Sequence, residues 1–123
     1  EIIKNKYKST HLLAFNEPYD CNGQSGQYGN MCVVDTSLTY YKNLLKSGLR
    51  MVSPACRQGA VFNWLDEFNS KAIEENIRID VIAVHWYDWG SNPQNSPNAN
   101  PQDVFNRFVN YLDSVYDMYG LPI

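Results

Sequence analysis

The sequence predicts an α/β fold built around a parallel sheet. Short apolar runs typical of buried strands alternate with longer segments in which apolar residues recur at helical spacing. This alternation requires parallel strands joined by right-handed crossovers. Both a doubly wound sheet and part of a barrel satisfy the pattern. A chain of 123 residues has room for one modest core, so we expect a single domain over 1–123.

The first strand is predicted at Leu12–Phe15, a short apolar run. Pro18 cannot donate to a sheet ladder, so the strand should end before it. Residues 16–34 then form a long loop with three glycines. Loops of this length inside a compact domain are often functional. Residues 1–10 are polar and basic, and they show no assignable pattern.

The first helix is predicted to begin near Asp35–Ser37, three consecutive good capping residues, and to end at Gly48. A second strand follows at Leu49–Val52, and Ser53 and Pro54 close it. The apolar stripe of this helix comprises Leu38, Tyr41, Leu44 and Leu45.

A second helix is predicted at Val61–Glu75 and a third strand at Ile79–Val84. Asn100 should cap a third helix, with Pro101 in its first turn and Gly120 at its end. The stripe of the second helix comprises Val61, Trp64, Leu65, Phe68, Ala72 and Ile73, and that of the third comprises Val104, Phe105, Phe108, Leu112, Val115 and Tyr119.

Composition argues against several classes of function. A net charge of −3 lacks the excess of basic residues typical of proteins that bind nucleic acid. No apolar stretch approaches the ~20 residues of a membrane helix. No glycine-rich phosphate loop follows a strand, and no set of residues has the spacing of a metal site. We therefore expect no nucleic-acid or membrane partner, no metal and no cofactor. Aromatic residues make up 14% of the chain, which suits sugar stacking as well as an ordinary core.

The chain has three cysteines, so at least one must be unpaired within the chain. Cys21 and Cys32 flank the glycine-containing loop, and a disulfide between them would close it in a secreted protein. Three ordinary thiols, including Cys56, are an equally good interpretation of the sequence.

Polar residues gather at the carboxyl ends of all three predicted strands. Asn16 and Glu17 follow the first strand, Ser53 follows the second, and His85-Trp86-Tyr87 follows the third. In a parallel sheet these ends share one face, where ligands bind. A carboxylic acid beside an amide suits a general acid and a neighbour that orients a hydroxylated substrate. Ser53 has no Asp-His partner pattern and is interpreted as a strand terminator rather than a nucleophile.

Four ordered motifs resemble glycoside hydrolase family 128. They are Leu-Leu-Ala-Phe-Asn-Glu-Pro at 12–18, Gly-Leu-Arg-Met-Val-Ser-Pro-Ala at 48–55, Trp64-Leu65 with Phe68, and Ile-Asp-Val-Ile-Ala-Val-His-Trp-Tyr at 79–87. The resemblance implies an α/β fold that is a partial (β/α)8 TIM barrel, with about half of the barrel present. The chain would run from the fourth strand to the start of the seventh. It also implies a retaining, endo-acting hydrolase of β-1,3-glucan.

The resemblance assigns roles to residues at the strand ends. Glu17 would be the general acid/base, Asn16 would hydrogen-bond the sugar near its 2-hydroxyl, and Tyr87 would orient the nucleophile. The nucleophile itself would be a glutamate beyond Ile123. A retaining enzyme needs its two carboxyl groups about 5–5.5 Å apart. The other residues expected to line the sugar subsites are His85, Trp86 and Trp89.

Other interpretations stay open at this point. Asp88 lies at the correct end but after the sixth strand, so it is a weak substitute for the nucleophile. The chain could instead be a non-catalytic carbohydrate-binding or structural fragment. A glycosidase of a related clan with another glycan preference also fits.

We expect the partner to be a β-glucan oligosaccharide or polysaccharide, and the protein to be secreted or associated with the cell wall. A half-barrel has open strand edges, so the isolated chain is expected to self-associate.

Overall fold

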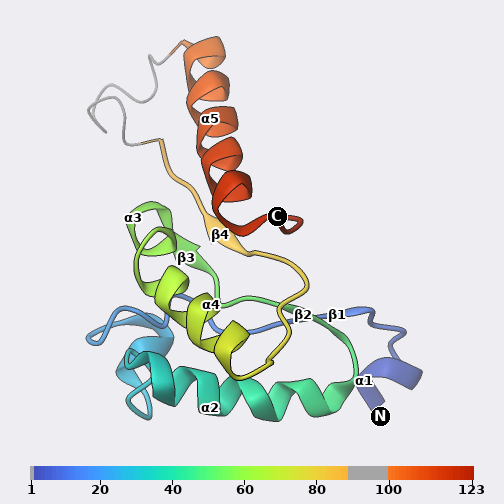
Figure 1. Cartoon of the computed structure of the whole chain (residues 1–123). Coiled ribbons are helices and arrows are strands. Elements are labelled where there is room, and N and C mark those ends of the chain that lie inside the picture. The colour runs from blue at the N-terminus through green and yellow to red at the C-terminus, as the bar shows by residue number, and fades with distance from the viewer. Residues whose placement is uncertain (1, 89–99) are drawn as a thin grey trace.

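The structure, a computed structural model, describes residues 2–88 and 100–123 (Figure 1). Its elements, in chain order, are α1 (Ile2–Asn5), β1 (His11–Leu13), η1 (Gln24–Gln27), α2 (Val34–Leu44), η2 (Leu45–Ser47), β2 (Arg50–Val52), β3 (Cys56–Arg57), α3 (Gln58–Val61), α4 (Trp64–Glu74), β4 (Val84–His85) and α5 (Pro101–Tyr119).

The strands are all parallel, as the alternation of strands and helices predicts. β1 pairs with β2, and β3 pairs with β4. Because β2 and β3 both belong to the extended segment 50–57, this segment lies between the first and third strand regions. Isolated bridges between Asn16 and Ala55 and between Val52 and Val81 extend the two pairings. The third strand is shorter than predicted, since only β4 and the bridge at Val81 are paired.

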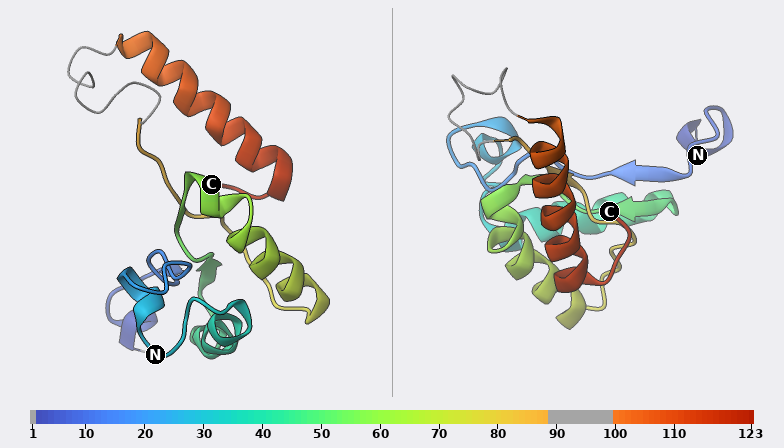
Figure 2. Two further views of the ribbon diagram at one scale, coloured as in Figure 1. Left: turned by 90° about the vertical axis from the view of Figure 1, so that its left-hand side faces the viewer. Right: turned by 90° about the horizontal axis from the view of Figure 1, so that it is seen from above.

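α4 lies between α2 and α5 and packs against α2 (Figures 1 and 2). α5 contacts the α3 region, where the Tyr119 hydroxyl donates to the carbonyl of Val61. The buried core lies between these helices and the strands. Tyr41 of α2 meets Phe68 of α4 edge to face, with ring centroids 5.3 Å apart. The other large buried side chains of this core include Leu38, Met51, Leu65, Ile82 and Val115.

The ends of α5 and the end of the first helical region agree with prediction. Asn100 Oδ1 accepts a hydrogen bond of 2.9 Å from the backbone N–H of Gln102, and Pro101 is the first residue of α5. Gly48 and Gly120 end their helical segments in the left-handed region, with φ of 67° and 61°.

Other helix boundaries differ from prediction. None of Asp35, Thr36 and Ser37 caps α2, because the helix already begins at Val34. The predicted second helix corresponds to α4, which begins three residues later than predicted because the Asn63 side chain accepts from the backbone N–H of Trp64 and caps the helix there. The short helix α3 that precedes it was not predicted. Three residues of the predicted stripes are exposed rather than part of the core, since Ile73 is 68%, Phe105 59% and Phe108 37% exposed.

The loop between β1 and α2 is closed by a disulfide between Cys21 and Cys32 and contains the short helix η1. Cys56 is a buried free thiol. Of the two interpretations of the cysteines, the structure therefore agrees with the one in which a disulfide closes the loop. No helix in the described part of the chain is long and apolar enough to cross a membrane.

Candidate active site

Glu17 lies just beyond β1, at the carboxyl end of the parallel strands. Its backbone N–H donates to the carbonyl of Ala55 over 2.8 Å, which ties the end of the first strand to the central segment. The backbone of Glu17 is in the left-handed region, with φ of 46°, which is uncommon for a residue other than glycine. Strained conformations of this kind concentrate at functional sites, where the surrounding structure holds them in place.

The Glu17 carboxylate contacts His85, as expected if the ends of neighbouring parallel strands converge. Oε1 of Glu17 lies 2.9 Å from Nδ1 of His85, and the two side chains are 12% and 32% exposed. Depending on where the proton resides, the imidazole N–H donates to the carboxylate or the carboxylic acid donates to the ring nitrogen. The contact fixes the position of the Glu17 carboxyl group.

Two residues not singled out from the sequence complete the surroundings of Glu17. The hydroxyl of Tyr19 is buried and has no hydrogen-bond partner among the described residues. Burial, and next the negative charge of Glu17, raise the pKa of Tyr19 to about 12. The guanidinium of Arg57 lies 5.6 Å from the centre of the Tyr19 ring, and its positive charge opposes that rise. Arg57 ends β3, a short strand that was not predicted from the sequence, so no sequence signal indicated its position.

Asn16 is held by the disulfide-closed loop. Its side-chain Nδ2 donates to Gln24 Oε1 over 2.8 Å. Its backbone N–H donates to the Ser25 hydroxyl over 3.2 Å, and its carbonyl accepts from the backbone N–H of Ser25 over 3.1 Å. The side-chain carbonyl Oδ1 is then the group of Asn16 left to accept a hydrogen bond from a ligand.

Three concave regions surround the Asn16–Tyr19 segment. One of about 480 Å³ is lined by Tyr19, Arg57, Gln58, Gly59, Ala60 and Asn63. A second of about 390 Å³ is lined by Asn16, Gln24, Ser25, Gln27 and Tyr28. A third, of about 130 Å³, runs along the strands past Asn16, Ser53 and His85. The first two regions are shallow and open to solvent.

The remaining predicted site residues are not all brought together. The Trp86 ring lies against Phe108 of α5, with centroids 5.1 Å apart, so its contact is with the helix. The Tyr87 side chain is half exposed, and its carbonyl accepts from the side chain of Gln58. Trp89 lies outside the described residues. The roles predicted for these three residues stay predictions.

Asp88 and Ser53 both have structural partners. Both carboxylate oxygens of Asp88 accept from Arg107, each over 2.8 Å, in a bidentate ion pair. The Ser53 hydroxyl is buried, donates to the carbonyl of Pro54 over 3.0 Å and accepts from the backbone N–H of Ala83 over 2.9 Å. Ser53 thus joins the second and third strands, in agreement with its interpretation as a strand terminator.

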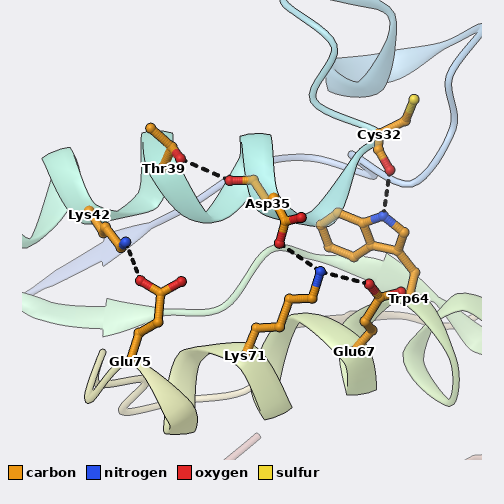
Figure 3. A network of polar contacts seen from close by, with 8 residues as sticks. All are labelled: Cys32, Asp35, Thr39, Lys42, Trp64, Glu67, Lys71 and Glu75. Carbon is orange, nitrogen blue, oxygen red and sulfur yellow. Dashed lines mark hydrogen bonds and ion pairs between the residues drawn. The ribbon is translucent and has the colours of Figure 1, made fainter.

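A polar network outside the site fixes the start of α2 to α4 (Figure 3). Lys71 pairs with Asp35 at 2.6 Å and with Glu67 at 3.1 Å. The Trp64 indole N–H donates to the carbonyl of Cys32 over 2.8 Å. The Trp64 ring stacks on Phe68, with centroids 5.6 Å apart, in the core position predicted for both. Across the described ranges, no three His, Cys, Asp or Glu side chains lie together in a way that could hold a metal ion.

The comparison with known families decides the assignment. The family model described as the glycosyl hydrolase catalytic core matches residues 1–123. The chain belongs to the glycosyl hydrolase catalytic core family. No curated protein matches it.

Two solved structures extend this assignment. Both are variants of a family 128, subgroup I, endo-β-1,3-glucanase from Amycolatopsis mediterranei, each with one glutamate replaced by alanine. One is in complex with laminaripentaose, and the other with laminaritriose and laminaribiose. Each is 31% identical to this glycosyl hydrolase chain and superposes with a TM-score of 0.74.

The resemblance to glycoside hydrolase family 128 is thereby confirmed. The match covers 99% of this chain and 45% of each of those chains, so the chain spans a little under half the length of its solved neighbours.

Proposed function

We propose that the full-length protein is a retaining endo-β-1,3-glucanase in which Glu17 is the general acid/base. The observation that supports this most directly is the Glu17 carboxyl group, held 2.9 Å from His85 at the carboxyl end of a parallel sheet. That end carries the reactive groups of barrel enzymes. The neighbouring solved structures are a β-1,3-glucanase bound to laminari-oligosaccharides, which supports the substrate class.

The proposed chemistry uses two carboxyl groups in two steps. Glu17, protonated, donates its proton to the glycosidic oxygen while a second carboxylate attacks the anomeric carbon and forms a glycosyl-enzyme ester. Glu17, now ionised, takes a proton from water, which attacks the anomeric carbon and releases the sugar with retained configuration. His85 holds Glu17 in position through both steps.

We place the second carboxylate on a glutamate that follows Ile123 in the full-length protein. Two other acidic residues near the strands are already engaged. Asp88 is paired with Arg107, and Asp80 accepts a hydrogen bond of 2.7 Å from the backbone N–H of Met51. The fold that would bring such a glutamate to Glu17 is a (β/α)8 barrel of which this chain forms about half. The parallel strands and the 45% coverage of the solved neighbours support that proposal.

Asn16, His85, Trp86, Tyr87 and Trp89 are the residues that we propose to bind sugar. Asn16 and His85 have the best structural support, because both line the groove of about 130 Å³ that runs along the strands beside Glu17.

We further propose that the protein works outside the cell, either secreted or at the cell wall. The Cys21–Cys32 disulfide supports this, because disulfides persist in oxidising compartments. The measurement is cell fractionation. Recovery of the protein solely from the cytosol, with reduced Cys21 and Cys32, would contradict this location.

The 123-residue chain on its own is expected to self-associate, because β1 is an edge strand and its last residue, Leu13, is 69% exposed. A monomer at all concentrations in sedimentation would contradict this.

The test of the function is hydrolysis by the full-length protein. Laminarin, a β-1,4-glucan and a mixed-linkage glucan are each incubated with it, reducing ends are counted, and the first-formed anomer is identified by NMR. We expect reducing ends from laminarin, with the β-anomer formed first. Binding without any reducing ends would favour a non-catalytic carbohydrate-binding protein, and preferred cleavage of another glucan would favour a related-clan glycosidase.

A further inference from the structure

We propose that the disulfide-closed loop, residues 21–32, forms a glucosyl-binding subsite beside Glu17. The subsite is the concave region of about 390 Å³ lined by Asn16, Gln24, Ser25, Gln27 and Tyr28. This proposal rests on the proposed function, since the ligand is a glucosyl unit of the same β-1,3-glucan chain. It adds a part of the molecule to which no role was assigned from the sequence.

The lining of this region has the chemistry of a neutral sugar site. It contains amide, hydroxyl and aromatic groups and no charged side chain. A side-chain amide can donate and accept hydrogen bonds at the same time, as the hydroxyl groups around a pyranose ring do. The Tyr28 side chain is 67% exposed and offers an apolar ring face with a polar tip. A phosphorylated or acidic ligand would find no cation among these residues.

Part of the hydrogen-bonding capacity of the lining is left for a ligand. Gln24 Oε1 accepts from Asn16, which leaves the amide NH₂ of Gln24 without a partner among the described residues. Gln27 Nε2 donates to the carbonyl of Gln24 over 3.1 Å, which leaves the side-chain carbonyl of Gln27. Because Gln24 and Gln27 both line the region, it offers a donor and an acceptor, as recognition of a hydroxylated ligand requires.

The loop is built to hold these groups in place. The disulfide joins its two ends. Gly26 is buried against the carbonyls of Pro18 and Asp20, where an added Cβ would lie only 2.3 and 2.1 Å from the two oxygens. At its far end, the carbonyl of Cys32 accepts from the Trp64 indole of α4. A preorganised site of this kind loses little conformational entropy when the ligand binds.

The loop also connects the subsite to the proposed catalytic residue. Three hydrogen bonds join Asn16 to Gln24 and Ser25, and Asn16 directly precedes Glu17. Asn16 also lines the groove of about 130 Å³ that His85 lines, and His85 contacts Glu17. A glucan chain that occupies both the subsite and this groove would therefore pass beside the Glu17–His85 pair.

The test measures binding of laminaripentaose by calorimetry in the full-length protein carrying Glu17→Gln, which prevents turnover during the titration. Tyr28→Ala is added to that background. Tyr28→Phe keeps the ring, and Tyr116→Ala removes a similarly exposed tyrosine, 58% exposed, from α5. We expect Tyr28→Ala to raise the Kd by about tenfold, the size expected for loss of one aromatic platform, and both controls to stay within about twofold.

The outcomes separate the two proposals. Unchanged affinity in Tyr28→Ala and in a second variant, Gln27→Ala, would overturn the subsite while laminarin hydrolysis by the wild-type protein leaves the proposed function intact. Absence of both laminaripentaose binding and laminarin hydrolysis would overturn the proposed function and the subsite together. Circular dichroism of each variant confirms that it is folded before its Kd is compared.

Discussion

Nδ1 of His85 lies 2.9 Å from Oε1 of Glu17, although 68 residues separate the two along the chain. The parallel strand regions bring them together. The bridge between Asn16 and Ala55 places Glu17 beside the central segment, and the pairing of β3 with β4 places His85 on its other side. The contact therefore joins the outer two of the three strand regions across the central one.

Replacing His85 by alanine should reduce the catalytic efficiency of the full-length protein. Glu17 would lose the partner that fixes its carboxyl group, and misplacement of a catalytic group by about 1 Å can cost about 100-fold. We expect kcat/KM for laminarin to fall by about 10- to 100-fold and the pH profile to change.

The matched control for this variant is His11→Ala. His11 contacts the Thr10 hydroxyl at the opposite end of the strands, so its loss should leave kcat/KM unchanged. Equal rates in His85→Ala and the wild-type protein would contradict the positioning role of His85.

Gly26→Ala should displace the disulfide-closed loop. A methyl group at this position would lie within 2.3 Å of two backbone carbonyl oxygens, which cannot move away as a flexible side chain would. We expect the free energy of unfolding to fall by about 1–3 kcal/mol, the usual cost of overpacking. Urea unfolding monitored by tryptophan fluorescence measures this loss.

The control for this variant is Gly59→Ala, since an added Cβ there meets nothing within 4 Å, and its stability should be no lower than that of the wild type. Equal stabilities of the two variants would contradict the packing role of Gly26.

Some helix boundaries could be predicted from the sequence, because the residues that set them act locally. Asn100, Pro101 and Gly120 bound α5 as predicted, because a cap, a first-turn proline and a left-handed glycine act within one turn. The start of α2 did not follow from its three capping candidates. The hydroxyl of one of them, Ser37, instead donates to the carbonyl of Met31 over 2.6 Å. Tertiary contacts of this kind override local preference.

The candidate site likewise has a part that could be predicted from the sequence and a part that could not. That Asn16, Glu17 and His85 share one end of the sheet could be predicted, because strand ends meet there in any parallel sheet. The roles of Tyr19, Arg57 and the disulfide-closed loop could not, since they depend on how residues 18–32 pack. That packing is set by the Cys21–Cys32 disulfide and the burial of Gly26, and neither has a periodic signal.

Stability should fall at alkaline pH through Cys56. Burial, and next the charge of Glu17, raise the pKa of the Cys56 thiol to about 12, whereas an exposed thiol ionises near about 8.5. About two pH units below 8.5, the thiol is protonated in both the folded and the unfolded state, and the protein keeps its full stability with respect to this group. As the pH rises toward about 12, the unfolded chain loses a proton that the folded chain keeps, so unfolding becomes easier by up to about 1.4 kcal/mol per pH unit.

The measurement is urea unfolding of the wild type and Cys56→Ala at pH 8 and pH 10. We expect the wild type to lose more stability than the variant between these two pH values. An identical loss in both proteins would show that the thiol ionises equally in the folded and unfolded states.

The most direct test of the account is laminarin hydrolysis by the full-length protein with Glu17→Gln, beside Glu74→Gln as a control in an exposed position of α4. The amide keeps the shape of Glu17 but cannot donate an acidic proton. We expect kcat to fall by at least about 100-fold in Glu17→Gln, with laminaripentaose still bound, and not to fall in Glu74→Gln. Wild-type rates in Glu17→Gln would contradict the central claim that Glu17 is the general acid/base.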